Sequence, residues 1–442
     1  PSKNRVGLSF YPYYTAGKIG TQGCRIAYRF EIVMAFLKFA CYNHMGGGLM
    51  PAKNYAYVNK EMLVWARGET PFVTPEAAAS YLSGISSEQI ASWECGTDCP
   101  SITEAKKLAS LYRVPLACFY LSTPPEKRVK KYTDRRTING TVYSEISYEL
   151  WSEIARISSN REKILDYTDP EEFVGLSFPT FAQDKTIEEI ANDLRCFLGL
   201  NLPFKTKSAY KNNAFNFFRS IFEHKGITVS QITGVSLNEM RGLSICYDIC
   251  PIIAINNRDF ERAKVFSLFH ELAHLVRRSS SLCKIDFDER NDEEEKICDR
   301  IAAATLLPKT SFLETAKKLF EKYNEWSSTS LQAIGDRFGV SSVVVLRRLY
   351  ELRVIRKSVY NTVYKALNDE FEAKREMIER SRKGKNIPVH FYVKYLNQQG
   401  YLFPRAIMNA HANGKLTYGE MCRTLNVNSK HIGNIERAVM FT

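Results

Sequence analysis

The chain has 442 residues, a formal net charge of +13 and 45% hydrophobic residues. This length predicts two or three domains with sizeable cores. No apolar stretch approaches the ~20 residues of a membrane-spanning helix, so no membrane partner is expected. The 11 cysteines are an odd number without the spacing of a disulfide framework. They predict reduced thiols in a cytoplasmic protein.

The first 49 residues show no clear hydrophobic periodicity and are set apart from the fold prediction. They end in three glycines, residues 46–48, shortly before Met50. Glycine codons are rich in G, as is a ribosome-binding site. We therefore favour the hypothesis that translation starts at Met50 and that residues 1–49 are translated upstream sequence. The alternative is a native basic arm.

The stretch 74–94 predicts a helix, a turn and a second helix. Pro75 fits the first helical position, Gly84 fits the turn, and Ser86 can cap the second helix. Further helices are expected over two segments, residues 102–112 and 115–121. The pattern resembles an Xre-type helix-turn-helix domain, here residues 50–122.

The charge of this domain argues against strong DNA binding. The second helix would begin with Ser86, Ser87 and Glu88, it carries no Lys or Arg, and the domain is net acidic. Because phosphate neutralisation dominates affinity, this domain alone should bind DNA poorly. A module that forms a homodimer or binds another protein is at least as good an explanation. A basic linker, residues 123–140, offers the missing charge through Lys127, Arg128, Lys130 and Lys131.

Two strands are predicted over residues 242–247 and 251–257, just before an H-E-x-x-H motif formed by His270, Glu271 and His274. The motif lies in an apolar segment without Gly or Pro, so a helix is expected. Residues four apart share one face of a helix, so both imidazoles can reach one Zn²⁺. Glu271 would lie beside them as a general base. The alternative is a buried helix with two structural histidines.

A third zinc ligand is expected on the predicted helix that ends at Pro308. Glu295 and Asp299 are four apart and share a face. Glu295 can offer a carboxylate oxygen to the metal, and Asp299 can accept the far N–H of a ligating histidine. Glu293 and Glu294 compete with Glu295 for the ligand role, since an acidic run is often only a solvated face.

Four segments together resemble the ImmA/IrrE family of zinc metallopeptidases: residues 242–245 (GLSI), 251–256 (PIIAIN), 266–275 (FSLFHELAHL) and 295–308 (EKICDRIAAATLLP). The resemblance implies a peptidase domain over residues 141–355, with His270, His274 and Glu295 as zinc ligands. The family often carries Asn at the position of Asp299, a change that preserves a hydrogen-bond acceptor. Its members are encoded largely on phages and mobile elements. The resemblance therefore implies a site-specific protein substrate, typically a helix-turn-helix repressor.

Two further helix-turn-helix-like patterns follow. Residues 331–352 form one, and the family resemblance gives it a structural role at the end of the peptidase domain. Residues 415–439 form the other, within a basic helical C-terminal module, residues 356–442. Its second helix carries Lys430 and Arg437, which are candidate nucleic-acid contacts. Between the two patterns, a charged helix, residues 370–385, is predicted to run into a flexible linker.

The sequence thus predicts an α+β, mostly helical protein. A zincin-like peptidase domain with a small sheet is flanked by helical, helix-turn-helix-like modules. The predicted function is a zinc-dependent site-specific endopeptidase with a protein substrate, and DNA binding stays open. The alternative is a non-enzymatic DNA-binding regulator or antitoxin-like protein that uses the zinc fold as a scaffold or sensor. The presence of Glu271 argues against it, because a scaffold needs only metal ligands.

Overall fold

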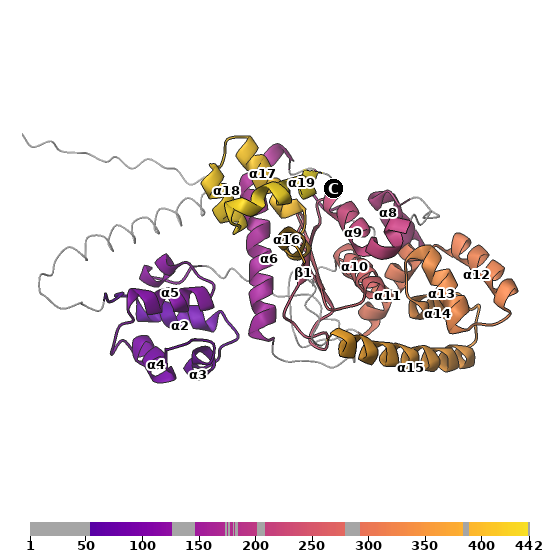
Figure 1. Ribbon diagram of the computed structural model, residues 1–442, viewed down its shortest axis with the longest axis horizontal. Helices are drawn as coiled ribbons and strands as arrows, with labels where there is room; N and C mark the ends of the chain where they lie inside the picture. The colour runs from indigo at the N-terminus through magenta and orange to yellow at the C-terminus, as the bar shows by residue number, and fades with distance from the viewer. Residues whose placement is uncertain are drawn as a thin grey trace, which may run out of the picture. The chain divides into compact units, whose positions relative to one another are not determined.

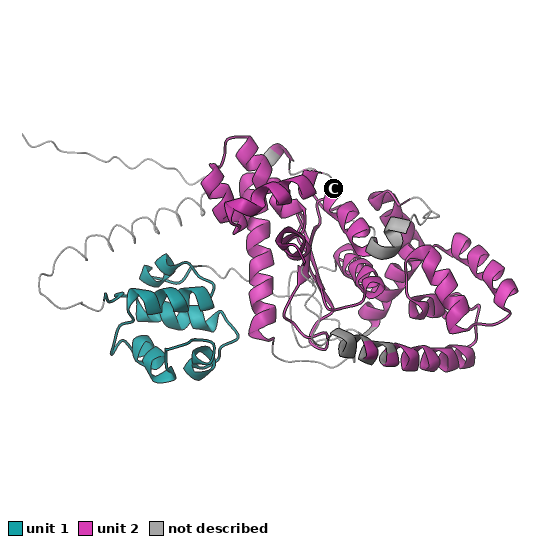
Figure 2. Ribbon diagram, viewed as in Figure 1, with its two compact units in different colours: residues 1–128 teal, residues 129–442 magenta. Residues whose placement is uncertain are grey.

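The computed structural model describes residues 54–125, 146–172, 175, 177–179, 181, 184–200, 208–278, 292–382 and 389–440. These residues belong to two compact units, a first unit within residues 1–128 and a second unit within residues 129–442 (Figure 2). The segment 1–49 and the four basic linker residues Lys127, Arg128, Lys130 and Lys131 lie outside the described residues.

The first unit is helical: α2 (Lys60–Gly68), α3 (Pro75–Ala79), α4 (Ser87–Cys95), α5 (Ile102–Leu111) and η1 (Leu116–Tyr120). Both helices of the predicted helix-turn-helix pattern begin at a side-chain cap, and Ser86 is the one predicted above. Thr74 accepts a hydrogen bond from the Ala77 amide, and Ser86 forms a capping box with Gln89 at the start of α4. We call α3 and α4 the first helix pair. Helix α2, which begins after the N-cap Asn59, was not predicted.

The second unit combines one sheet with many helices (Figure 1). The strands are β1 (Thr228–Ile232), β2 (Gly242–Ile245) and β3 (Ile252–Asn256). The helices are α6 (Tyr148–Tyr167), η2 (Pro170–Glu172), α8 (Ile187–Leu198), α9 (Ser208–His224), α10 (Glu261–Val276), α11 (Asp292–Leu306), α12 (Lys309–Tyr323), α13 (Ser328–Phe338), α14 (Ser342–Glu351), α15 (Lys357–Arg382), α16 (Phe391–Gln399), α17 (Leu402–Ala412), α18 (Tyr418–Leu425), η3 (Ser429–His431) and α19 (Ile432–Met440). No helix in the described ranges is long and apolar enough to cross a membrane.

The sheet has the order β1-β3-β2, with β1 parallel and β2 antiparallel to β3. The two predicted strands correspond to β2 and β3, whereas β1 was not foreseen. Side chains alternate between the two faces of a strand. Leu243 and Ile245 of β2 therefore pack with α6 residues on one face. Gly242 faces the other way, toward Glu271 of α10.

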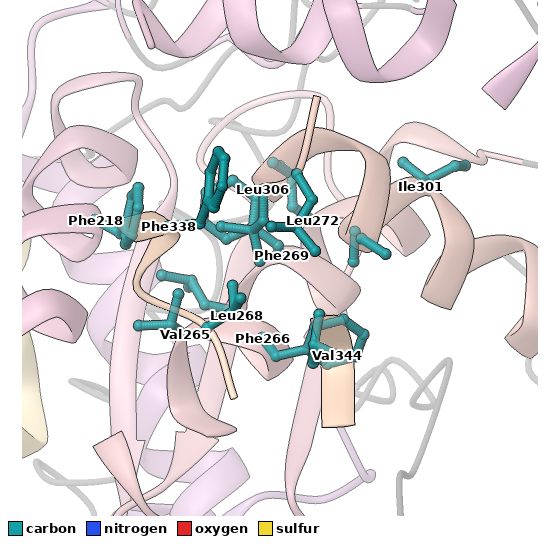
Figure 3. Close-up of a cluster of buried hydrophobic side chains, with 14 of the residues drawn as sticks. Phe218, Val265, Phe266, Leu268, Phe269, Leu272, Ile301, Leu306, Phe338 and Val344 are labelled. Carbon is teal, nitrogen blue, oxygen red and sulfur yellow. The ribbon is translucent and has the colours of Figure 1, made fainter. Parts of the chain in front are cut away.

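Helix α10 is the centre of the second unit. Every residue of Val265–Val276 is buried, so the helix is enclosed by its neighbours on all sides. Figure 3 shows its apolar side chains beside residues from α9, α11, α13 and α14. Phe269 contacts the rings of Phe218 and Phe222 edge-on, with centroids 5.0 and 5.3 Å away. This packing fixes the backbone that carries the H-E-x-x-H motif.

The predicted C-terminal module, residues 356–442, packs within the second unit. Helices α16 and α17 contact β1, and α17 also contacts α6. A buried ion pair, Arg219 with Glu223, lies at this junction. The Arg219 guanidinium donates to the Leu396 carbonyl at 2.5 Å, and Glu223 accepts from the Tyr401 amide at 2.9 Å. The C-terminal helices and the sheet thus pack against each other around one buried junction.

Candidate metal centre

Two histidines of α10 point their outer ring nitrogens at a common point. The Nε2 atoms of His270 and His274 lie 3.0 Å apart. His270 is fully buried, and His274 keeps only 6% of its surface exposed. The helical spacing of four residues brings the rings together, as the sequence predicted.

Helix α11 brings one glutamate to the same point. Glu295 Oε2 lies 3.2 Å from His270 Nε2, and its Oε1 lies 3.8 Å from His274 Nε2. The two competing glutamates lie elsewhere. Glu294 makes a two-pronged ion pair with Arg277, with both N–O distances at 2.9 Å, and Glu293 has an exposed side chain. The structure therefore groups Glu295, and neither neighbour, with the histidines.

The donor set fits zinc in chemistry and size. Two imidazole nitrogens and one carboxylate are the ligands of many catalytic zinc sites, in which a fourth position stays open. Donors at about 2.0–2.1 Å around a tetrahedral ion lie roughly 3.3 Å from each other. The separations of 3.0 Å between the two Nε2 atoms and 3.2 Å from His270 Nε2 to Glu295 Oε2 lie close to that value, and the other carboxylate oxygen lies 3.8 Å from His274 Nε2. The Glu295 side chain is 38% exposed, so the centre opens toward solvent on the α11 side.

Asp299 occupies the predicted place behind His270. Its Oδ1 lies 2.9 Å from His270 Nδ1, so the ring donates through Nδ1–H and keeps a lone pair on Nε2. A partner absent from our prediction holds the other oxygen, because Arg347 Nη1 of α14 donates to Asp299 Oδ2 at 2.6 Å. Arg347 Nε also donates to Glu351 at 3.3 Å. A chain of charged groups thus runs from α14 to the metal centre.

His274 has its own neighbour, the buried thiol of Cys298. The sulfur lies 3.4 Å from His274 Nδ1. Burial raises the pKa of the Cys298 thiol, which keeps the sulfur neutral. A neutral sulfur is a weak acceptor for Nδ1–H, and this tautomer again leaves Nε2 free for a metal. No motif in the sequence marked Cys298 for this position.

Glu271 is fully buried and lies against β2. Gly242 provides the space. A Cβ added there would meet Glu271 Oε1 at 2.6 Å, Cγ at 3.1 Å and Cδ at 3.2 Å. Any larger residue would displace the carboxylate, so the glycine of the G-L-S-I segment has a steric role beside the proposed base. The sequence analysis predicted this segment as a strand and as part of the family resemblance, and gave Gly242 no role of its own.

The candidate nucleic-acid residues are distant in sequence from the metal centre. Ser86 and Ser87 begin α4 in the first unit. Lys430 lies in η3 and Arg437 in α19, and both are exposed. No described contact joins any of these residues to the histidines or to Glu295.

Residues 223–350 match the family model Peptidase_M78, described as the IrrE N-terminal-like domain. The match contains β1 to β3, the H-E-x-x-H helix, Glu295 and Arg347. It supports the predicted family resemblance for this stretch and identifies a metallopeptidase-like domain of a zinc-type family. The match does not extend to residues 50–122, so the Xre-type assignment stays a prediction. No curated protein matches the chain.

Proposed function

We propose that this protein is a zinc-dependent, site-specific endopeptidase whose substrate is a helix-turn-helix repressor of a phage or mobile-element system. The observation that carries the proposal is the placement of Glu271. It is wholly buried, lies beside the two histidines on α10, and has its space secured by Gly242. A zinc scaffold would need the three ligands but no such carboxylate. The Peptidase_M78 match supports the peptidase part of the proposal.

His270, His274 and Glu295 would hold the ion, with Asp299 and Cys298 fixing the two rings. Zn²⁺ held there would supply Lewis acidity toward water and toward a peptide carbonyl oxygen. Glu271 would take a proton from the attacking water on a carboxylate oxygen. It would then pass that proton to the leaving amine nitrogen as the peptide bond breaks. Proton and bond counts balance without another reactant.

Strand β2 offers a way to bind an extended substrate. It lies at one edge of the sheet and begins at Gly242, next to Glu271. A peptide segment pairing with β2 through main-chain hydrogen bonds would lie along the metal centre. The identity of the repressor rests on the family resemblance alone.

A comparison of protein N-termini tests the proposal. Cells that express the wild-type chain, or Glu271→Gln, are lysed and all new N-termini are labelled and sequenced. We expect a dominant new N-terminus within one helix-turn-helix protein, present with wild type and lost with Glu271→Gln. A cleavage that persists in Glu271→Gln would refute Glu271 as the base, and no new N-terminus at all would favour the non-enzymatic regulator.

A further inference from the structure

The third helix pair consists of α18 and of α19 with the preceding η3, joined by a short connection. Thr417 and Glu420 form a capping box at the start of α18, and Asn426 ends it with a φ of 54°. Asn428 then caps η3, which continues into α19. The inward side chains belong to one apolar cluster that also contains residues of α6, α16 and α17: Met421, Leu425, Val427, Ile432, Ile435 and Val439. Three residues thus separate α18 from η3, and α18 and α19 each pack against α17, whose side chains belong to the same apolar cluster.

One face of the second helix carries nucleic-acid chemistry. Lys430, Asn434 and Arg437 follow each other at steps of four and three, so they form one stripe, and all three are exposed. The buried Ile435 and Val439 lie on the opposite side. Lysine binds phosphates, whereas Asn and Arg are the side chains that pair in two-pronged fashion with adenine and guanine. Arg437 also donates to Asn434 Oδ1 at 2.7 Å, so the two groups are presented together.

The other two helix pairs lack such a face. In the first helix pair, α4 starts with Ser87 and Glu88 and contains no Lys or Arg. In the second helix pair, α13 and α14, the two arginines of α14 serve the fold. Arg347 binds Asp299, and Arg348 is 3% exposed and donates to the Leu307 carbonyl and to Glu188. Among the described pairs, only the third carries exposed cationic and amide side chains on its second helix.

We propose that the third helix pair binds duplex DNA sequence-specifically, with the stripe Lys430, Asn434 and Arg437 in the major groove. Gly433 helps, since nothing lies within 4 Å of a Cβ built there and the backbone can approach the bases closely. Helix α17 packs against both α18 and α19 and is itself held by Glu223. The reading helix is therefore carried on a rigid support.

The test uses the full chain and a library of random duplexes. Bound duplexes are selected and sequenced over several rounds, and affinity for the winning sequence is measured over a salt series. We expect wild type to enrich one motif. Arg437→Ala should weaken binding to that motif by roughly 10- to 100-fold and relax one base position. Lys430→Ala should weaken binding to all duplexes and lower the salt slope by about one.

Matched controls separate base reading from bulk charge. The double variant Lys430→Ala/Arg437→Ala is compared with Lys317→Ala/Lys318→Ala, which removes the same charge from exposed residues of α12. A loss of motif enrichment confined to the first double variant supports the proposal. Equal loss in both variants, loss only on changing Ser86 and Ser87 or the linker lysines and arginines, or no motif at all would overturn it. Thermal melting shows that each variant is folded.

Discussion

A single added methyl group at Gly242 should disable the proposed base while leaving the metal ligands in place. The Cβ of Gly242→Ala would lie 2.6 Å from Glu271 Oε1, and an ordinary contact begins near 3.4 Å. The oxygen must therefore retreat by about 0.8 Å. The Cγ and Cδ atoms are also too close, at 3.1 and 3.2 Å, so the whole side chain must turn. The backbone of α10 cannot shift to relieve the contact, since the residues on either side of Glu271 are buried.

The expected loss follows from this displacement. A misplacement of about 1 Å in a reacting group can cost on the order of 100-fold in rate. We therefore expect Gly242→Ala to lower the cleavage rate by roughly 30- to 100-fold, or about 2–2.7 kcal/mol in activation free energy. Zinc content should stay at the wild-type level, because the three atoms nearest to the added methyl group all belong to Glu271 and none to a metal ligand.

The assay pairs zinc content with the rate of the cleavage found by N-terminal sequencing. Gly419→Ala is the matched control, since nothing lies within 4 Å of a Cβ at Gly419 and its backbone is helical. The control should retain the wild-type rate. A Gly242→Ala variant that keeps both zinc and full rate would refute the role of Glu271. Loss of zinc in Gly242→Ala would show that the clash is relieved through the histidines instead.

Four further outcomes are expected. The full chain should bind about one Zn²⁺ by elemental analysis, and Glu271→Gln should retain it; full occupancy after His270→Ala together with His274→Ala would contradict the site. Asp299→Ala should lower zinc affinity by about 10- to 100-fold in a chelator competition, and an unchanged affinity would mean that His270 needs no support from Asp299. Gly400→Ala should destabilise the chain by about 3 kcal/mol or more in urea unfolding. The φ of Gly400 is +84°, and a Cβ there would meet the Glu223 carboxylate and lie 2.7 Å from the Val229 carbonyl oxygen. An unfolding midpoint equal to that of wild type would show that this junction can relax. Burial raises the pKa of Tyr395, so the phenol ionises at lower pH in the unfolded chain, and the free energy of unfolding falls as pH rises above about 10. Tyr395→Phe should make that fall shallower. An unfolding free energy with the same pH dependence as wild type would contradict this.

The sequence identified the elements whose pattern is local. The apolar run around H-E-x-x-H predicted α10, and the continuation to Pro308 predicted α11, which ends at Leu306. Both strands before the motif were found within two residues of their ends. Strand β1 was missed because its five residues, TVSQI, mix polar and apolar positions that are all buried. Burial of Ser230 and Gln231 depends on neighbours that no local pattern reveals.

The candidate metal centre likewise combines residues that local spacing predicts with residues that it does not. His270, Glu271 and His274 lie within about one helical turn, so spacing sufficed to predict that they lie together, and the same spacing placed Asp299 on the face of Glu295. Spacing alone left three glutamates in competition, and the tertiary partner of Glu294 separates them. Arg347 lies 48 positions after Asp299 and belongs to a stretch we predicted only as a structural helix pair. Such long-range pairings follow from the packing of α14 on α11, which sequence periodicity does not encode.

The buried pair Arg219 and Glu223 explains why the C-terminal helices do not form a separate body. Two charges removed from water are costly, and loss of either partner leaves the other buried at a cost of about 3–5 kcal/mol. The Glu223 carboxylate accepts from the Tyr401 and Leu402 amides at the start of α17, and Arg219 donates to the Leu396 carbonyl near the end of α16. Both residues lie on α9, directly before β1. Removal of residues 356–442 would take away these hydrogen-bond partners and uncover β1 and α6 where α16 and α17 pack, so the metal-bearing fold and the third helix pair should be lost or kept together.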